Sequence, residues 1–298
     1  MPATSIHRRD FIQQVGLGIT AAVCGVLPAK ARGGRTRQVI AVSDLHVGKT
    51  AGGLDGSDWF ERCQADLRLN LPDVEMGLTL GDITHHGDRA SLSEYIRVRD
   101  GGPVPKWREL AGNHEYRGGG IRHFKSLLRD TALYREEDGN VVWYFISDED
   151  GGTPGRVSPE TLEQLRSAVW ADRGKIVIVA SHQPPYKTVR RSEQNDFCLH
   201  PKEAVVSLLT DLPIDLWLCG HEHHSPYSAG NLSVKYGTAC INVASISHAY
   251  GTRSSGSLIL EFSENYRFVT LRRRDHDLQK FRDEFTWRIP VKAAVQPA

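Results

Sequence analysis

The stretch IDLWLCGHEHH, residues 214–224, joins an apolar run to a cluster of polar side chains. Its first six residues predict a buried strand. The next five contain three histidines and one glutamate, which a protein core accommodates only with polar partners. We therefore expect other segments of the chain to supply groups that face this cluster.

Four other apolar runs also end in polar residues. The runs and their followers are RQVIAV (37–42) with Ser43-Asp44-Leu45-His46, MGLTL (76–80) with Gly81-Asp82, WRELA (107–111) with Gly112-Asn113-His114-Glu115, and KIVIVA (175–180) with Ser181-His182. Helix-like segments lie between them, at residues 57–70, 158–174 and 200–212. The alternation predicts an α/β fold with a largely parallel sheet covered by helices. Ligands of such sheets bind beyond the carboxyl ends of the strands, where these polar residues fall.

The pattern changes after residue 225, where strand hairpins replace the alternation. The expected strands are residues 232–237, 238–245, 255–262 and 266–274. Short turns separate them, as is typical of antiparallel strands. We expect the part of the chain from 226 to 298 to consist mainly of β hairpins that form a second sheet packed on the first.

The polar strand ends offer carboxylates, an amide and imidazoles. They are Asp44, His46, Asp82, Asn113, His182, His221 and His223. Any one of them alone would be read as an ordinary polar residue with a hydrogen-bond partner. Seven oxygen and nitrogen ligands are too many for one ion, because a structural zinc site closes with four. Together they predict a site for two metal ions.

The order D-x-H, G-D, G-N-H-E, H, G-H-x-H resembles the signature of the calcineurin-like metallophosphoesterases, from Asp44 to His223. The resemblance implies a four-layer αββα sandwich of two mixed β-sheets flanked by helices. It also implies the following ligands: Asp44, His46 and His223 for one ion, Asp82 as a bridge, and Asn113, His182 and His221 for the second ion. His114 would be the catalytic residue that lies over the substrate phosphate.

The implied activity is hydrolysis of phosphate esters through two-metal activation of a bridging hydroxide. The ion identities stay open among Mn, Fe, Co and Zn. The run GDITHHGD, residues 81–88, resembles bacterial enzymes that act on cyclic nucleotides or glycerophosphodiesters. We therefore expect a small phosphodiester substrate. The alternatives are a phosphomonoesterase of the same fold and, from another class, a non-catalytic metal- or phosphate-binding module. The presence of Asp82 and His114 disfavours the binding module.

Several residues around this signature are candidates for supporting roles. Purple acid phosphatases have a tyrosine three residues after the bridging aspartate, where this chain has His85. We expect Glu222 to point away from the ions and His224 to lie at the rim. Candidates for binding the substrate phosphate are Arg117, Arg190, Arg191 and Arg253, although a solvated surface arginine is the ordinary interpretation of each. Candidates for orienting the histidines are Asp215, Glu115 and Asp88.

The first 31 residues resemble a twin-arginine export signal. Arg8 and Arg9 precede Phe11 and a short apolar stretch, and Ala29-Lys30-Ala31 is a small-x-small cleavage pattern. We therefore expect residues 1–31 to engage the twin-arginine export machinery and residues 32–298 to form a single domain. The mature protein would be periplasmic or extracellular. A lipid anchor on Cys24 is a weaker alternative, because Val23 suits a lipobox poorly.

The composition excludes some partners of the mature chain. Loss of three basic residues and one acidic residue with the signal changes the formal net charge from +1 to −1. We therefore expect no nucleic acid partner. The apolar stretch is too short for a stable membrane anchor. Cys219 and Cys240 lie in apolar runs, and we expect buried free thiols there.

Overall fold

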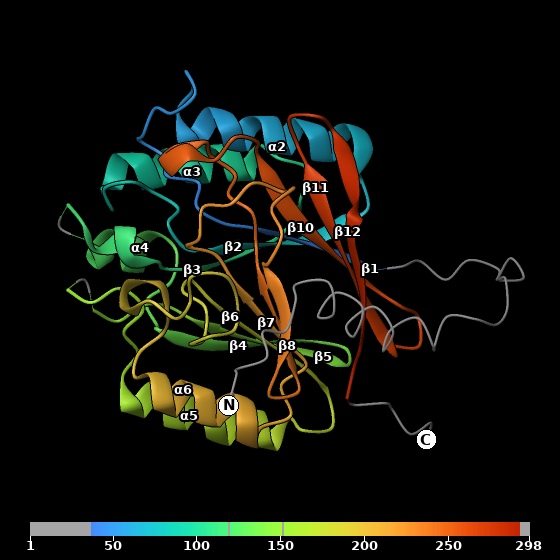
Figure 1. The fold of residues 1–298 in the computed structure, drawn as a ribbon. Coiled ribbons are helices and arrows are strands. Elements are labelled where there is room, and N and C mark those ends of the chain that lie inside the picture. Colours follow the sequence, from blue (N-terminus) through green and yellow to red (C-terminus); the bar gives the residue numbers. More distant parts are fainter. Residues whose placement is uncertain (1–36, 119, 151, 293–298) are drawn as a thin grey trace, which may run out of the picture. The chain divides into compact units, whose positions relative to one another are not determined.

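The computed structural model describes residues 37–118, 120–150 and 152–292. Thr36–Ala298 forms one compact unit, in which two six-stranded β-sheets pack face to face (Figure 1). The predicted export signal, residues 1–31, and Cys24 lie outside the described residues. Within the described part of the chain, none of the helices is long and apolar enough to traverse a lipid bilayer.

The first sheet contains the three strands nearest the N-terminus and the three nearest the C-terminus. Its order is β12 (Lys280–Pro290), β11 (Phe268–Asp275), β10 (Gly256–Phe262), β1 (Arg37–Val42), β2 (Val74–Leu80) and β3 (Trp107–Leu110). Strands β1, β2 and β3 are parallel, whereas β10 pairs antiparallel with β1. The carboxyl ends of β1–β3 therefore meet at one edge.

The second sheet is built from the middle of the chain. Its order is β4 (Leu133–Asp138), β5 (Val141–Ile146), β6 (Ile176–Ser181), β7 (Leu216–Cys219), β9 (Thr238–Asn242) and β8 (Leu232–Lys235). Strands β5, β6, β7 and β9 are parallel. Both sheets are mixed, because each also contains antiparallel pairs.

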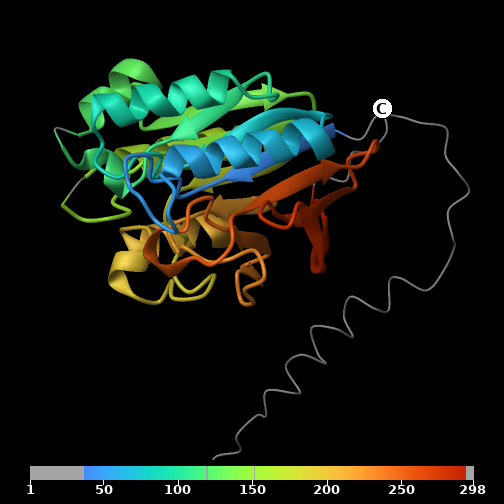
Figure 2. The same cartoon turned by 90° about the horizontal axis from the view of Figure 1, so that it is seen from above.

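Helices cover the outer face of each sheet. They are α2 (Gly56–Asn70), α3 (Arg89–Asp100), α4 (Ile121–Leu127), α5 (Pro159–Ala171) and α6 (Lys202–Asp211). Helices α2 and α3 lie side by side over the first sheet (Figure 2), and α5 and α6 cover the second. Asp55 and Ser158 cap α2 and α5 with their side-chain oxygens. The predicted four-layer αββα sandwich is confirmed.

The alternation of the five polar-ended strands with helices predicted a single, largely parallel sheet. This expectation is wrong, because the five strands are divided between two sheets. Strands β1–β3 belong to the first sheet, and β6 and β7 to the second. The physical reason is that each strand is covered on both faces. Val39 packs between the sheets while Ile40 packs against the helices. A strand in one helix-covered sheet has the same apolar pattern, so the sequence does not distinguish the two arrangements.

The C-terminal strands are also divided between the sheets, which corrects the expectation that residues 226–298 form one second sheet. Strands β8 and β9 extend the second sheet, and β10–β12 extend the first. Strands β4, β5 and β12 had no counterpart in the sequence prediction. The described cysteines are all buried and free, as expected for Cys219 and Cys240; they are Cys63, Cys198, Cys219 and Cys240.

Candidate metal centre

The carboxyl ends of the five strands meet where the two sheets adjoin. The Asp44 amide donates to Gly81 O at 3.2 Å, which joins the loops after β1 and β2. His182 Nδ1 donates to Leu80 O at 2.7 Å, and this bond links the end of β6 to the end of β2 across the sheets. The two sheets therefore hold their polar ends in fixed relative positions.

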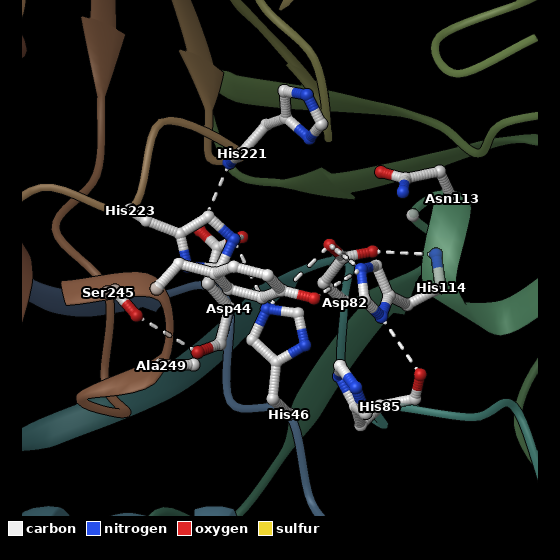
Figure 3. A network of polar contacts seen from close by, with 12 residues as sticks. Asp44, His46, Asp82, His85, Asn113, His114, His221, His223, Ser245 and Ala249 are labelled. Carbon is white, nitrogen blue, oxygen red and sulfur yellow. Dashed lines mark hydrogen bonds and ion pairs between the residues drawn. The ribbon is translucent and has the colours of Figure 1, made fainter. Parts of the chain in front are cut away.

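Six of the seven predicted ligands form two groups that could each hold a metal ion. The groups are Asp44, His46, Asp82 and His223, and Asp82, His182 and His221. The candidate ligand atoms of each group lie within 4.8 Å of one another, and Asp82 belongs to both groups. Figure 3 shows the first group, in which the side chains of Asp44, His46, Asp82 and His223 lie close together. The structure therefore brings six of the predicted ligands together, in two groups that share Asp82.

Asn113, the seventh predicted ligand, lies beside the second group. It begins the short 3-10 helix Asn113–Tyr116 that follows β3, and its side chain lies beside His114 in Figure 3. Gln183 Nε2 donates to Asn113 Oδ1 at 3.2 Å. This hydrogen bond orients the Asn113 amide.

The backbone at the site is held in an unusual conformation. Five of the predicted ligands have a left-handed backbone, with φ of 56° at Asp44, 50° at His46, 48° at Asp82, 73° at His221 and 47° at His223. This conformation is unfavourable for residues other than glycine, and it concentrates at functional sites where the surrounding structure enforces it. Here each such residue follows a strand, and the turn directs its side chain to the shared edge.

Two glycines of the signature are required by close packing. A Cβ atom at Gly220 would overlap Ser43 Oγ, and one at Gly112 would overlap the Asp82 carboxylate. The close approach lets the His221 amide donate to Asp44 Oδ2 at 3.0 Å and the His114 amide donate to Asp82 Oδ1 at 2.9 Å. The carboxylates are therefore held by the loops that carry the histidines.

Buried carboxylates dominate the electrostatics of the site. Burial alone would lower the pKa of His182, but Asp82, Asp44 and Asp148 outweigh it and raise that pKa to about 10. Burial alone would raise the pKa of Asp82, but His182 and His114 hold it well below its ordinary value. By contrast, burial and the neighbouring His223 lower the pKa of His46. The carboxylates favour positive charge at the point where the groups meet.

The donor set fits divalent metal ions. Asp44 Oδ1 is buried and has no hydrogen-bond partner in the described residues. Asp82 Oδ2 lies 3.1 Å from His182 Nε2. The Nδ1–H of His182 is engaged by Leu80 O, so Nε2 is the nitrogen that would bind an ion, which would take the place of the Nε2 proton. The mixture of imidazole nitrogen and carboxylate oxygen suits Zn and Mn or Fe.

The structure also brings His85 to the site, in a third group with His46 and His114. The His85 ring centroid lies 4.9 Å from that of His114 and 5.5 Å from that of His46. His114 Nδ1 lies 2.9 Å from the carbonyl oxygen of His85. In the sequence, His85 lies three residues after the predicted bridging aspartate. Nothing in the sequence predicted that His85 packs against His46 and His114.

A cavity of about 1070 Å³ opens beside the two groups. It is lined by Asp82, His114, His221 and His223, and by the four candidate arginines Arg117, Arg190, Arg191 and Arg253. Phe197, Tyr227 and Tyr250 supply aromatic surface in the same cavity. None of these three aromatic residues was predicted from the sequence, because no spacing relates them to the strand ends.

Glu222 and His224 belong to none of the groups. Glu222 lines the cavity and is 6% exposed, and burial raises its pKa to about 8. The ring nitrogens of His224 each lie 2.9 Å from a carbonyl oxygen, one of Ser225 and one of Asn242. His224 therefore links the loop after β7 to Asn242 at the end of β9.

Of the three carboxylates considered as orienting groups, only Glu115 lies against the site. It accepts hydrogen bonds from the amides of Thr84 at 2.9 Å and Gly112 at 2.8 Å, which ties together the loops after β2 and β3. Asp88 instead caps α3. Asp215 accepts from the Val177 amide at 2.9 Å, at the opposite end of β6.

Comparison with known proteins identifies the class. The sequence pattern of the calcineurin-like phosphoesterases matches residues 37–225. Because the match covers more than half of the chain, the chain belongs to this family, whose members are hydrolases of phosphoric ester bonds. None of the curated protein sequences matches the chain significantly.

Solved structures show the same fold at low sequence identity. A dimetal phosphatase from Danio rerio is 13% identical with a TM-score of 0.68, covering 86% of this chain and 99% of its own. A purple acid phosphatase from yellow lupin (Lupinus luteus) seeds is 15% identical with a TM-score of 0.63, covering 89% and 55%. The protein described as the GAP50 anchor in the inner membrane complex of Plasmodium is 14% identical with a TM-score of 0.60, covering 86% and 89%.

Proposed function

We propose that this phosphoesterase hydrolyses small phosphodiesters at a two-metal centre, with cyclic nucleotides and glycerophosphodiesters as the substrate types to test first. The observation that carries the proposal is the cavity beside the two groups, which is lined by four arginines. None of the four forms an ion pair with a carboxylate of the described residues. The Arg191 guanidinium packs over the Phe197 ring, 3.6 Å from its centroid, and all four arginines line the cavity that an anionic substrate would enter.

The ligand roles follow the two groups. Asp44, His46 and His223 would hold one ion, Asp82 would bridge, and the second ion would be held by Asn113, His182 and His221. Bound ions supply positive charge that neutralises phosphate oxygens and lowers the pKa of a water molecule. The loops that carry the ligands hold them in place before substrate binds, since their carboxylates already accept hydrogen bonds from the backbone.

His114 is placed to act on the leaving alcohol. Its Nδ1 donates to His85 O, so its Nε2 faces the cavity, 3.8 Å from Asp82 Oδ2. When its Nε2 is protonated as well as its Nδ1, a histidine in this position can give the Nε2 proton to the oxygen of the breaking P–O bond or stabilise its charge. The peptide hydrogen bond from the His114 amide to Asp82 keeps the imidazole beside the phosphate site.

The size and lining of the cavity favour a diester. A phosphodiester has a substituent on each side of the phosphate, and both need space near the ions. The cavity volume, about 1070 Å³, lies at the upper end of the range for small-molecule sites. Phe197 and Tyr227 supply apolar surface for a sugar, base or glycerol group.

The test is turnover of matched esters by protein loaded with Mn, Fe, Co or Zn. We expect a higher kcat/KM for bis(p-nitrophenyl) phosphate than for p-nitrophenyl phosphate, and turnover of at least one cyclic nucleotide or glycerophosphodiester. The double variant Arg190→Ala, Arg191→Ala should raise KM by at least about tenfold, since one charge-assisted hydrogen bond contributes about 1.5–3 kcal/mol. Arg89→Ala, an exposed arginine at the start of α3, is the control. A clear preference for the monoester would favour the phosphomonoesterase alternative.

We also propose that the protein is exported with its metals bound, because twin-arginine systems transport folded proteins. Arg8, Arg9 and the Ala29-Lys30-Ala31 pattern support this proposal. A lipid anchor on Cys24 remains the weaker alternative.

A further inference from the structure

Tyr250 lies over the candidate metal centre. Its ring centroid is 4.6 Å from that of His223 and 5.3 Å from that of His46. Its hydroxyl oxygen is 3.4 Å from His114 Nε2. The residue is 53% exposed and lines the same cavity as Asp82 and His114. A substrate phosphate in this cavity would therefore meet the Tyr250 hydroxyl as well as His114.

The loop that carries Tyr250 is fastened to the ligand-bearing segments. The hydroxyls of Ser245 and Ser247 donate to Asp44 O at 3.0 and 2.9 Å. On the other side of Tyr250, Thr252 Oγ1 donates to His223 O at 2.9 Å. The position of Tyr250 is thus set by the same two segments that carry Asp44 and His223.

Tyr250 itself has a strained backbone. Its φ of 56° and ψ of 28° lie in the left-handed region, which is unfavourable for a residue with a Cβ. Lys49 Nζ lies 3.8 Å from the centroid of its ring and holds it by a cation–π contact. An exposed aromatic side chain gains little stability from such an arrangement. Strain of this kind is found at functional sites where the surrounding structure enforces it, and Tyr250, unlike Tyr236, lies in the cavity of the candidate metal centre.

The hydrogen-bond pattern leaves the Tyr250 hydroxyl free to donate. The His85 carbonyl can only accept, so the hydrogen of neutral His114 is on Nδ1 and its Nε2 is an acceptor. The Tyr250 O–H then points toward Nε2 across 3.4 Å, which is long for a hydrogen bond from a hydroxyl. A phosphate oxygen that enters this space is a better acceptor, since hydrogen bonds to charged oxygens are shorter and stronger.

We propose that Tyr250 is a further catalytic residue of this phosphoesterase, whose hydroxyl donates a hydrogen bond to a non-bridging phosphate oxygen beside His114. This inference rests on the proposed function, because it places the substrate phosphate in the same cavity. The oxygen gains negative charge as the phosphorus is attacked, and a fixed donor aimed at it stabilises the transition state more than the bound substrate. The hydroxyl keeps its hydrogen throughout.

The test compares Tyr250→Phe with the wild type. This variant retains the ring, and with it the contacts to His46, His223 and Lys49, and removes only the oxygen. We expect kcat on the better of the two p-nitrophenyl esters to fall about 10²- to 10³-fold with KM within about twofold. Binding of orthovanadate, measured by calorimetry on the metal-loaded protein, should weaken by a similar factor. Metal stoichiometry and the thermal midpoint should not change.

Tyr236→Phe is the matched control. Tyr236 is also exposed and has a left-handed φ of 53°, but it does not line the cavity of the metal centre. It should match the wild type in every measurement. Tyr250→Gly, which relieves the backbone strain, should fold at least as stably as the wild type and show a loss of kcat no smaller than that of Tyr250→Phe.

Two results would overturn the proposal. Wild-type kcat and orthovanadate affinity in Tyr250→Phe would make the ring, and not the hydroxyl, the functional part. Loss of a metal equivalent in Tyr250→Phe would make Tyr250 a support of the metal centre. Failure of the proposed substrate class is a separate result, because it appears in the wild type as preference for the monoester.

Discussion

His46 Nε2 and His223 Nε2 lie 3.2 Å apart, although 177 residues separate them in the chain. Their rings stack with centroids 4.8 Å apart and an interplanar angle of 21°. Two nitrogens bonded to one zinc ion, each at about 2.0–2.1 Å, are separated by roughly 3 Å. The spacing of these two imidazoles is therefore the spacing that a shared ion requires, and it is fixed by strands from both sheets.

Removing the charge of Asp82 should disrupt both halves of the centre. Asp82→Asn retains the shape of the side chain but leaves two cations with one fewer shared negative charge. We expect loss of at least one of two metal equivalents, measured by mass spectrometry. Loss of a residue that only hydrogen-bonds a metal ligand typically lowers activity about 10- to 100-fold. Because Asp82 is itself a predicted ligand, turnover should fall by more than this.

Asp283→Asn is the control for this variant, because the Asp283 side chain is 89% exposed on β12. It should retain the wild-type metal content and rate. Two tightly held metals and a normal rate in Asp82→Asn would contradict the bridging role.

Loss of His114 should affect the chemical step and not metal binding. His114→Ala should retain both metals and lose about 10²–10⁴ in rate on an ester with a poor alkoxide leaving group. The loss should be smaller for p-nitrophenolate, which leaves without protonation. The measurement is kcat for a series of diesters with leaving groups of different pKa, with His123→Ala on α4 as the control. If His114→Ala strips a metal, His114 is a ligand; equal losses for all leaving groups would exclude its action on the leaving oxygen.

A buried ion pair far from the cavity should control acid stability. Asp66 on α2 accepts from Arg274 Nη2 at 2.6 Å and from His276 Nδ1 at 2.7 Å, which ties α2 to the first sheet. Burial alone would raise the pKa of Asp66, but the hydrogen bonds from Arg274 and His276 outweigh it and hold that pKa well below 3.8. Its contribution to stability is therefore complete above pH 3.8, the pKa of an unperturbed Asp, and is lost as the pH falls below it.

Asp66→Asn leaves the Arg274 charge buried without its partner. We expect the free energy of unfolding at pH 7 to fall by about 3–5 kcal/mol. The stability of the variant should also depend less on pH below about 4 than that of the wild type. Urea unfolding followed by circular dichroism measures both. A parallel pH dependence in the two proteins would mean that Asp66 titrates normally in the folded state.

Export should depend on the arginine pair. Replacing Arg8 and Arg9 by lysine should leave precursor in the cytoplasm, whereas Arg35→Lys, beyond the predicted cleavage site, should be exported normally. Cell fractionation and the N-terminal sequence of the mature protein give the result. Normal yield of mature periplasmic protein from the double variant would exclude the twin-arginine route.

The strands with polar ends, and the polar residues that follow them, could be predicted from the amino-acid pattern alone. The apolar runs at 37–42, 76–80 and 107–111 became β1, β2 and β3 within two residues at each end, because buried strands are long continuous apolar segments. The ligand candidates could be selected because each comes immediately after a strand. Their joint position at one edge then follows from the parallel arrangement.

Two features could not be predicted from the sequence and depend on the tertiary fold. They are the sheet that each strand joins and the residue that lies over the candidate metal centre. A strand covered on both faces has the same apolar pattern in one sheet or in two stacked sheets, so the division between β1–β3 and β6–β7 has no local signal. Tyr250 reaches His114 across 136 residues of chain because its loop is bonded to Asp44 and His223. Such a contact depends on how distant segments pack together, and no spacing in the sequence encodes it.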